Sequence, residues 1–374
     1  MAVTEIHAKT ILNKQKKIDS WFLSRYGMNI YRGCLHNCVY CDGRAEKYRV
    51  EGNFGTDITV KTNAPELLHK ALGPSRRRVP LKPSFIMLGG GVGDSYQPVE
   101  KKYLLTRRSL EVIETHGFPV HILTKSTLVE RDVDILKRIS STSSALLSMS
   151  FATVDDTTSR AIEPRCAPPS ERLRLLSEIK RQGLSTAMFL LPVLPGISDT
   201  QASIDHAVAK AKEACVDFVA FGGLTLKPGR QKDAYYKFID AMDPELPSRY
   251  NKIYPGNKWG TAVTKYYERI DARFAEAAGR YRVARRAPSY LFKEILDEND
   301  RVVVTLENLG YFTKSQGERS PYGHAAYTIS KLKTPLSAMG PTLHELQGVS
   351  TSIRKIIHEI LKTGASKLHE SYFF

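Results

Sequence analysis

The sequence has no apolar run long enough to cross a lipid bilayer. The longest such run, residues 187–194, falls far short of the roughly 20 residues that a membrane-spanning helix needs. Residues 1–20 are polar and basic and lack the apolar segment of a signal peptide. We therefore expect a cytoplasmic protein with no membrane partner.

Cysteine is also scarce, with 5 in 374 residues. A chain of this length with so few thiols has no disulfide framework, which excludes the class of small secreted scaffolds. Three of the five, Cys34, Cys38 and Cys41, lie within a single short segment. Crowding of this kind indicates a metal or cluster site in a reducing compartment.

Acidic residues are outnumbered by basic ones, 39 to 55, which gives a formal net charge of +16 and a pI near 9.5. Such an excess favours polyanionic partners through counterion release, although a merely solvated positive surface would have the same composition. The basic residues cluster at three places: Lys14, Lys16 and Lys17; Arg76, Arg77 and Arg78; Arg282, Arg285 and Arg286.

Short β-rich runs alternate with helical segments along the first part of the chain, the pattern of βα units around a parallel sheet. This predicts an α/β fold, a partial (β/α)6 barrel whose active site forms from loops at the carboxyl ends of the strands. One intervening helix is predicted from Ser170 as N-cap to Gly183, with Leu173, Leu176 and Ile179 on one face. The predicted strands are residues 28–32, 85–88, 120–123, 146–150, 187–191 and 218–221.

The length favours one large catalytic domain with a smaller appendage. We expect a basic N-terminal extension over residues 1–24 and the barrel over 25–225. An extension of the barrel with a basic linker would occupy 226–286, and a small all-α domain 287–374.

Cys34, Cys38 and Cys41 are spaced C-x3-C-x2-C directly after the first predicted strand. Three thiolates on one loop can bind three irons of a [4Fe–4S] cubane and leave the fourth iron open for another ligand. A structural zinc site would need a fourth ligand, which His36 is poorly placed to supply. An electron-transfer ferredoxin would need a fourth cysteine nearby.

This spacing, with the aromatic Tyr40 just before the last cysteine, resembles the signature of the radical S-adenosylmethionine (SAM) superfamily. The resemblance implies that the open iron chelates SAM and that the reduced cluster cleaves it to methionine and a 5′-deoxyadenosyl radical. It also implies that Gly89, Gly90 and Gly91, after the second predicted strand, contact the methionine part of SAM. A tight turn would explain these glycines equally well.

Further segments resemble the spore photoproduct lyase-like branch, over roughly residues 25–225. They are Asp94 to Lys101, Leu105 to Arg108, Thr124 to Ser126 with Arg131 and Asp132, Glu163 to Arg165, and Pro192 to Gly196. The resemblance implies cofactor or substrate contacts for Thr124, Lys125, Ser148, Ser150 and Glu163, each of which would otherwise be a polar group at the barrel rim.

A spore photoproduct lyase uses a separate cysteine to return hydrogen to the product radical, and this sequence has no cysteine that aligns clearly with it. Cys166, on a loop expected at the active side, is our candidate hydrogen donor, against the alternative of an inert loop residue. Cys215 is interpreted as a buried apolar residue. Tyr96 would relay hydrogen or, as we favour, pack.

From about residue 300 the chain resembles the helix-hairpin-helix domain at the start of polymerase-beta-like DNA polymerases. The resemblance implies phosphate binding by a hairpin and the helix N-terminus after it, at Gly348, Ser350, Ser352 and Lys355. Ser350 replaces the usual second glycine of the hairpin, and Ile356 stands where the lyase lysine would be. We expect DNA binding without abasic-site lyase activity, with a purely structural helical cap as the alternative.

Together these features predict a radical SAM enzyme that reverses pyrimidine photolesions in damaged or distorted DNA. It would use a [4Fe–4S] cluster, SAM and an electron donor such as ferredoxin or flavodoxin. The alternatives are radical SAM modification of RNA or a peptide, and an iron–sulfur DNA-binding protein without turnover.

Overall fold

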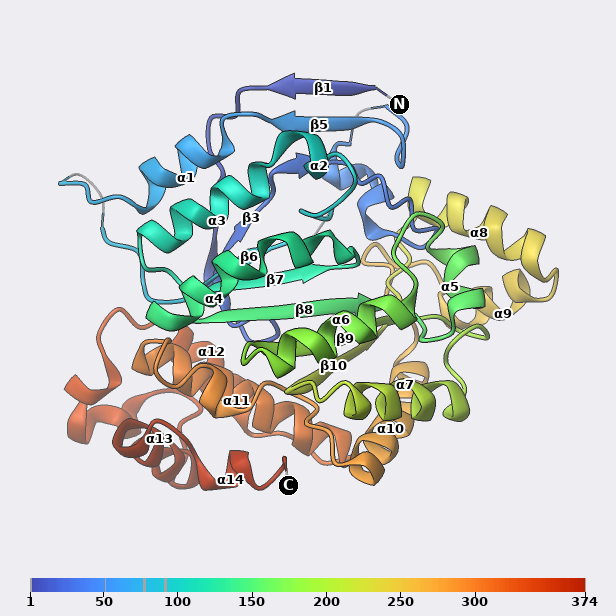
Figure 1. The fold of residues 1–374 in the computed structure, drawn as a ribbon. Helices are drawn as coiled ribbons and strands as arrows, with labels where there is room; N and C mark the ends of the chain where they lie inside the picture. The colour runs from blue at the N-terminus through green and yellow to red at the C-terminus, as the bar shows by residue number, and fades with distance from the viewer. Residues whose placement is uncertain (1, 51, 77–78, 91–92, 374) are drawn as a thin grey trace.

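The computed structural model describes residues 2–50, 52–76, 79–90 and 93–373. Its centre is a curled, seven-stranded half-barrel sheet with the strand order β10-β9-β8-β7-β6-β3-β2 (Figure 1). All neighbours pair in parallel except β2, which runs antiparallel to β3 at the edge. The strands are β2 Leu12–Asp19, β3 Ser24–Met28, β6 Phe85–Leu88, β7 Val120–Thr124, β8 Ala145–Phe151, β9 Ser185–Val193 and β10 Phe218–Gly223.

This sheet confirms the predicted partial barrel, and five of the six predicted strands coincide with β6 to β10. The first differs: the barrel strand is β3, Ser24–Met28, whereas Tyr31–Arg32 forms β4 in a separate sheet of order β1-β5-β4. The apolar pattern misses β3 because two of its buried residues are polar. Ser24 Oγ hydrogen-bonds to the carbonyls of Tyr26 and Phe85. The other strands of the small sheet are β1 Val3–Ile6 and β5 Ile58–Lys61.

Helices cover the outer, convex face of the sheet. Side chains alternate between the two faces of each strand, so Ile86, Leu147 and Met188 pack outward with these helices into one core. The helix predicted to begin after Ser170 starts at Pro169, since proline is well suited to a first turn. The covering helices are α1 Ala64–Leu72, α3 Leu105–Thr115, α4 Val133–Thr142, α6 Pro169–Arg181, α7 Gln201–Glu213 and α10 Thr264–Tyr281.

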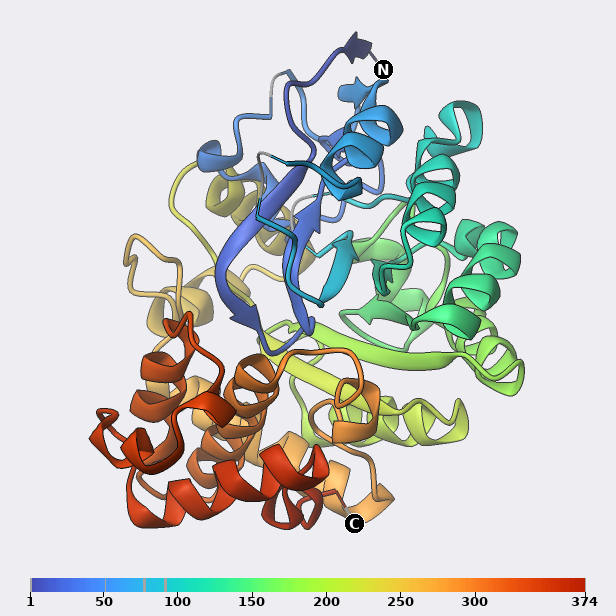
Figure 2. The same ribbon diagram turned by 90° about the vertical axis from the view of Figure 1, so that its left-hand side faces the viewer.

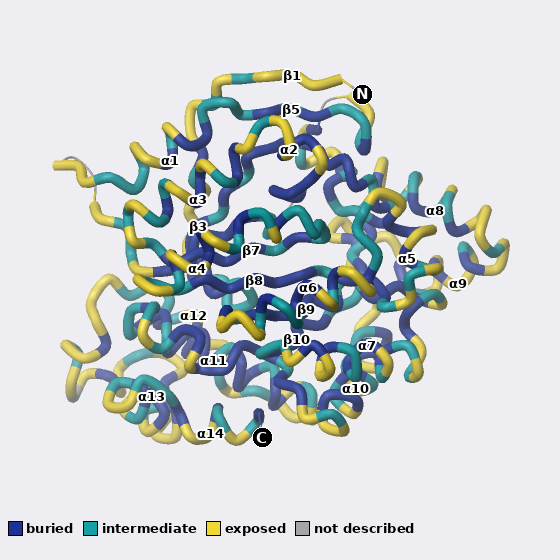
Figure 3. The backbone as a smooth tube through the Cα atoms, viewed as in Figure 1, coloured by how far each residue is buried: buried dark blue, intermediate teal, exposed yellow. Residues whose placement is uncertain are grey.

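The inner face is filled by the C-terminal helices, which gather on one side of the sheet in Figure 1. Phe85, Leu146, Phe189 and Phe218 point to this face and form a second core with α11 to α13. The dark-blue tubes of the sheet in Figure 3 reflect burial from both sides. The helices are α11 Glu298–Ser315, α12 Tyr322–Ser330, α13 Thr351–Thr363 and α14 Lys367–Glu370.

Ion pairs link these C-terminal helices to the barrel. Arg25 of β3 makes a bidentate pair with Asp300 of α11, and both side chains are almost fully buried. Lys82 and Asp297 add a second link at 2.8 Å. α13 packs by an apolar face, with Ile353, Ile356, Ile357 and Ile360 buried, and Gly364 ends the helix in the left-handed conformation.

The remaining helices lie near the carboxyl ends of the strands or in connections. They are α2 Glu100–Tyr103, α5 Asp156–Ile162, α8 Arg230–Met242 and α9 Leu246–Ile253, with short 3-10 turns η1 Asp42–Arg44, η2 Glu46–Tyr48, η3 Thr127–Asp132, η4 Ser289–Leu291, η5 Leu336–Ala338 and η6 Gly340–Glu345. Within the described ranges, no helix combines the length and apolar character needed to span a membrane.

Candidate active site

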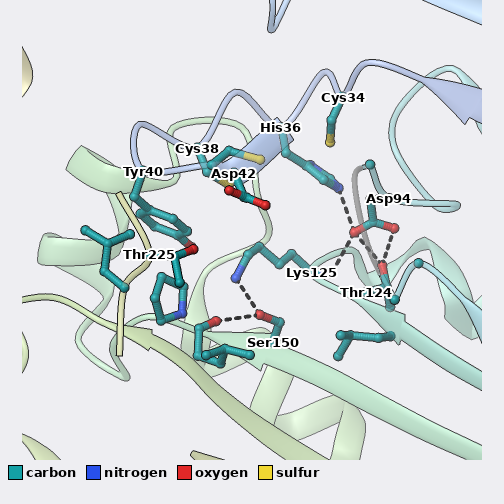
Figure 4. Close-up of a pocket in the computed structure, with 18 of the residues that line it drawn as sticks. Cys34, His36, Cys38, Tyr40, Asp42, Asp94, Thr124, Lys125, Ser150 and Thr225 are labelled. Atoms are coloured by element: carbon teal, nitrogen blue, oxygen red, sulfur yellow. Dashed lines mark hydrogen bonds and ion pairs between the residues drawn. The ribbon is translucent and has the colours of Figure 1, made fainter. Parts of the chain in front are cut away.

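A cavity of about 370 Å3 lies where the strands of the half-barrel end. It occupies the inner face beyond the second core: residues near the start of the strands, such as Phe85 and Leu146, contact the C-terminal helices, whereas Thr124 and Ser150, at the ends of β7 and β8, reach the cavity. Its wall includes Cys34, His36, Cys38, Tyr40, Cys41, Asp42, Gly89, Gly90, Gly93, Asp94, Thr124, Lys125, Ser150, Thr225 and Gln231 (Figure 4).

The three clustered cysteines line this cavity together, as their spacing predicts. Their loop is clamped by Gln97, whose side chain accepts from the Leu35 amide at 2.9 Å and donates to the Gly33 carbonyl at 3.2 Å. Cys34 and Cys38 are each 6% exposed, and burial raises the pKa of the Cys34 thiol. A buried thiol of this kind is inert unless a positive centre, such as iron, stabilises its thiolate.

The far end of the cysteine loop is held from the segment after β10. Gln231 of α8 donates to the Tyr40 carbonyl at 3.0 Å and to the Thr225 carbonyl at 2.8 Å. Lys227 forms an ion pair with Asp42, the residue that follows Cys41. The segment after residue 225 therefore supports the cavity, a role that sequence reasoning missed because neither residue belongs to a motif.

Gly89 and Gly90 line the cavity, and Gly91 lies outside the described residues. Gly89 has a φ of +83°, and a Cβ there would lie 2.1 Å from the Leu123 carbonyl oxygen of the neighbouring strand end. Gly93 has a φ of +115°, and a Cβ there would approach the Gly33 carbonyl to 3.1 Å. These positions need glycine because the β6 loop passes directly against backbone on both sides.

Asp94 joins the cysteine loop to the end of β7. Its carboxylate accepts from the Thr124 hydroxyl and the Lys125 amide, both at 2.8 Å, and lies 3.2 Å from His36 Nε2. His36 Nδ1 donates to the Arg165 carbonyl, which leaves Nε2 facing Asp94. Burial would lower the pKa of His36, but the facing Asp94 carboxylate outweighs it and raises that pKa.

Glu163 does not itself line the cavity but is the centre of a buried polar network behind Tyr40, Lys125 and Ser150, which do. It accepts from the Tyr40 hydroxyl and pairs with Lys125 at 2.9 Å and Arg172 at 2.5 Å. Lys125 also donates to Ser150 Oγ at 2.9 Å. Burial would raise the pKa of Glu163, but the two cations overcome it and hold the pKa at about 2. The structure thus brings together Tyr40, Lys125, Ser150 and Glu163, four residues that the sequence singled out.

Arg172 was missed by the sequence reasoning. It lies in α6 at helical spacing from the buried Leu175, Leu176 and Ile179, so a charged residue on an apolar face was the available signal. Its side chain is fully buried, and it also donates to the Ser159 hydroxyl at 3.2 Å.

Three other residues singled out from the sequence do not line the cavity. Tyr96 is fully buried and its amide donates to Asp94. Ser148 hydrogen-bonds to His121 at 2.7 Å inside the sheet, where burial lowers the pKa of His121 to about 4. Cys166 Sγ lies 3.7 Å from Cys38 Sγ, beside the cysteine loop.

Cys215 is exposed, so the interpretation of it as a buried apolar residue is wrong. It lies in the turn between α7 and β10, where its backbone has a φ of +55°.

The residues expected to bind nucleic acid lie on the C-terminal surface and not in the cavity. Gly348, Ser350, Ser352 and Lys355 are all exposed. Ser350 caps α13 by accepting from the Ile353 amide at 3.3 Å and contacts the Ser352 hydroxyl at 2.9 Å. The segment before the turn is the 3-10 turn η6 instead of an α-helix.

The cavity fits an iron–sulfur cluster with SAM. Three thiols of one loop line the cavity, enough for three corners of a cubane with the fourth left free, and Gly89, Gly90 and Gly93 line it beside them. Lys125 lines the cavity, and its ammonium, held 2.9 Å from the buried Glu163, is a charge suited to an anionic group of a ligand.

Comparison with known proteins gives a consistent result. Residues 28–208 match the model of the radical SAM superfamily. The chain is 30% identical over 285 residues to an uncharacterized protein of Mycobacterium tuberculosis (strain ATCC 25618 / H37Rv), covering 75% of this chain and 81% of that protein. It is 24% identical over 238 residues to the radical SAM Nalpha-GlyT isomerase of Pseudomonas phage M6, covering 62% of this chain and 46% of that protein.

Among solved structures, a spore photoproduct lyase mutant with bound AdoMet and dinucleoside spore photoproduct superposes with a TM-score of 0.55 at 14% identity. The superposition covers 75% of this chain and 79% of that chain, and at this identity it establishes the fold alone. The matched family region contains Cys34, Cys38 and Cys41, the three thiols that converge on the cavity. The chain therefore belongs to the radical SAM superfamily, whose members use a [4Fe–4S] cluster and SAM.

Proposed function

We propose that this radical SAM enzyme is a lyase that reverses pyrimidine photolesions in DNA. The observation that carries the proposal is the tri-cysteine cavity, set in a fold that resembles spore photoproduct lyase over 75% of the chain. The net charge of +16 supports a polyanionic substrate. The reaction would comprise hydrogen abstraction from the lesion, cleavage of the bond between the two bases, and hydrogen return.

Each part of the cavity wall would have a distinct task. Cys34, Cys38 and Cys41 would hold the cluster, and Gln97 would keep their loop in place. When bound, the reduced cluster supplies one electron that cleaves SAM and generates the 5′-deoxyadenosyl radical. The protein contribution is then to orient the reacting groups and exclude water.

Lys125 would bind an anionic group of SAM or of the substrate. Its ammonium lies between Ser150 and Glu163, each at 2.9 Å, so its position is fixed before a ligand arrives. Preorganised charge of this kind needs no rearrangement when the ligand binds. Tyr40 and Arg172 hold Glu163 from the other sides and so set the position of Lys125 indirectly.

Cys166 is the proposed hydrogen donor to the product. Once the three cysteines of the motif are assigned to the cluster, Cys166 and the exposed Cys215 are the remaining thiols of the chain. Cys166 lies beside Cys38 but does not line the cavity, so a loop movement would be required for its thiol to reach a substrate radical.

The test is an anaerobic assay of the full chain. The cluster is reconstituted and reduced with dithionite, SAM is added with ultraviolet-irradiated or untreated DNA, and 5′-deoxyadenosine and repaired thymine are quantified by mass spectrometry. The proposal expects thymine to be restored in irradiated DNA only. Formation of 5′-deoxyadenosine without repair would overturn the lesion lyase and retain the enzyme class.

A second candidate is an isomerisation or modification by the same radical. It is supported by the phage relative, whose name describes an isomerase. In that case thymine would not be restored. A search over unmodified DNA, RNA and peptides should then detect a product, whose mass is unchanged for an isomerisation and altered for a modification. A DNA-binding protein without turnover would form no 5′-deoxyadenosine at all.

A further inference from the structure

An exposed basic strand forms the edge of the half-barrel. β2 ends the strand order of the large sheet, and residues 13–17 of it are all exposed. Lys17 is held by Glu307 of α11 at 2.5 Å. Lys14 and Lys16 make no ion pair with any residue of the described ranges, so their charges face solvent.

An exposed tyrosine of the C-terminal helices lies next to this strand. Tyr327 of α12 is 54% exposed, and the Lys331 ammonium lies 4.0 Å from its ring centroid. α12 packs against α11, the helix whose Glu307 holds Lys17 of β2, so this ring and the basic strand belong to one surface. An exposed aromatic ring beside cations is the arrangement that binds bases and phosphates of nucleic acid together.

The other basic clusters of the sequence do not offer such a surface in the described structure. Arg286 is 7% exposed, because its guanidinium stacks 3.5 Å from the Tyr311 ring centroid and 4.4 Å from that of Trp21. Arg285 also stacks on Tyr311. Arg77 and Arg78 lie outside the described residues. Arg76 and Arg282 are exposed in their clusters, whereas Lys14 and Lys16 are two exposed cations on one strand.

The β2 strand also borders the active-site cavity. A smaller cavity of about 160 Å3 lies between β2 and the neighbouring strands, with Asn13 and Gln15 of β2 in its wall. Phe22 and Gly90 line both this cavity and the active site. Figure 2 shows β2 as the long blue strand that runs down toward the C-terminal helices. The strand therefore links the surroundings of the smaller cavity to these helices.

We propose that Lys14, Lys16, Tyr327 and Lys331 form a docking surface for the sugar–phosphate backbone of DNA. Lys14 and Lys16 alternate along β2 with Asn13 and Gln15, which line the smaller cavity, so DNA held by the lysines would lie at the sheet edge beside that cavity. This inference rests on the proposed function and names the surface that would deliver its substrate. The predicted hairpin lies close to this surface, because a Cβ on Gly348 would lie 2.8 Å from the Ala325 amide nitrogen of α12, the helix that carries Tyr327.

Lysines on an edge strand have another explanation, since they prevent the strand from pairing with a second molecule. The two roles respond differently to charge reversal. Glutamate protects an edge as well as lysine does, whereas it repels phosphate. The double variant K14E/K16E therefore separates them, with K137E/K212E, two exposed lysines of the outer helices α4 and α7, as a control with the same change in net charge.

The experiment measures binding of a fluorescein-labelled DNA duplex to the full chain by anisotropy over a series of salt concentrations. K14E/K16E is expected to weaken binding by about tenfold to a hundredfold and to reduce the slope of log K against log salt by about 2, because each phosphate contact contributes about 0.9. Y327A is expected to weaken binding with an unchanged slope. The control should match the unmodified protein, and all variants should keep the oligomeric state of the unmodified protein by light scattering.

The outcomes separate this surface from the proposed function. If K14E/K16E binds DNA as the control does, or if it self-associates while binding is kept, the docking surface is wrong, whatever the repair assay shows. If DNA binding is lost as expected but irradiated DNA is never repaired, the surface stands and the lesion lyase fails. Stronger binding of an acidic peptide than of DNA, lost in the same variant, would also overturn the assignment to DNA.

Discussion

The thiol of Cys166 lies 3.7 Å from the thiol of Cys38, so a loop 128 residues further along the chain contacts the cysteine motif directly. Cys38 and Cys166 differ in one respect: Cys38 lines the cavity and Cys166 does not. This relationship allows the two thiols to be tested separately, one for holding the cluster and the other for hydrogen return.

Cys166→Ala is expected to keep the cluster and the formation of 5′-deoxyadenosine while losing restored thymine. Since a thiol exchanges its proton with solvent, the unmodified enzyme in D2O should place deuterium in the product. Iron content, 5′-deoxyadenosine and product mass are measured together, with the exposed Cys215→Ala as control. Deuterated thymine from the Cys166 variant would assign the donor role elsewhere.

Cys38→Ala is expected to abolish cluster binding and all turnover, because the remaining two motif thiols cannot hold three irons. DNA binding should remain within about twofold if the basic surface on β2 and α12 does the binding. Iron and sulfide analysis and anisotropy provide the two readouts. A parallel loss of DNA affinity would contradict the separation of cluster and docking surface.

Glu163→Gln should destabilise the protein, because Lys125 and Arg172 would lose the carboxylate they share. Breaking a buried ion pair from one side typically costs about 3–5 kcal/mol. Denaturant unfolding monitored by circular dichroism measures the change, with the exposed Glu130→Gln as a matched control. If Glu163→Gln has the same free energy of unfolding as the control, the polar network around Glu163 is solvated in solution.

The same carboxylate predicts an acid-dependent loss of stability. The folded pKa of Glu163 is about 2, against an ordinary value of 4.5. A depressed pKa contributes stability that is fully present above pH 4.5 and is lost as the pH falls toward 2. The unfolding free energy of the unmodified chain should therefore decline over this interval by about 3 kcal/mol more than that of Glu163→Gln. Parallel curves for the two proteins would refute the assignment.

Asp300→Ala should also be strongly destabilising, because it leaves Arg25 buried without its partner between β3 and α11. The expected cost is about 3–5 kcal/mol, and the double replacement R25M/D300L should recover most of it, since a well-packed apolar pair of similar size is often no less stable. The exposed Asp233→Asn serves as control in the same denaturation series. A double variant as unstable as Asp300→Ala would mean that the pair specifies the packing.

The part of the site that sequence predicts is the part carried by local spacing. The cysteine motif and the glycines after β6 can be identified because neighbouring residues serve the same ligand. Gln231 could not be, because it acts on the Tyr40 carbonyl, 191 residues away in the chain. Arg172 is only 9 residues from Glu163, but it belongs to no motif and meets Glu163 through the packing of α6. Their role depends on helices whose placement is set by packing.

The fold follows the same division. Strands β6 to β10 are apolar runs and were predicted, whereas β3 carries Ser24 and Arg25, whose burial depends on partners at Phe85 and Asp300. The amphipathic α13 could be predicted from its isoleucines. That α13 helps to cover the inner side of the half-barrel could not be predicted, because this packing joins segments that lie far apart in the chain.

The second core has a consequence for synthesis on the ribosome. Phe85, Leu146, Phe189 and Phe218 emerge from the ribosome before α11 to α13, the helices that cover them. Until then the nascent half-barrel carries an open apolar face, the kind of surface that chaperones bind and that aggregates. Completion of this protein is therefore tied to release of its C-terminal helices, so translation stalled before α11 should yield a chaperone-bound chain and no folded barrel.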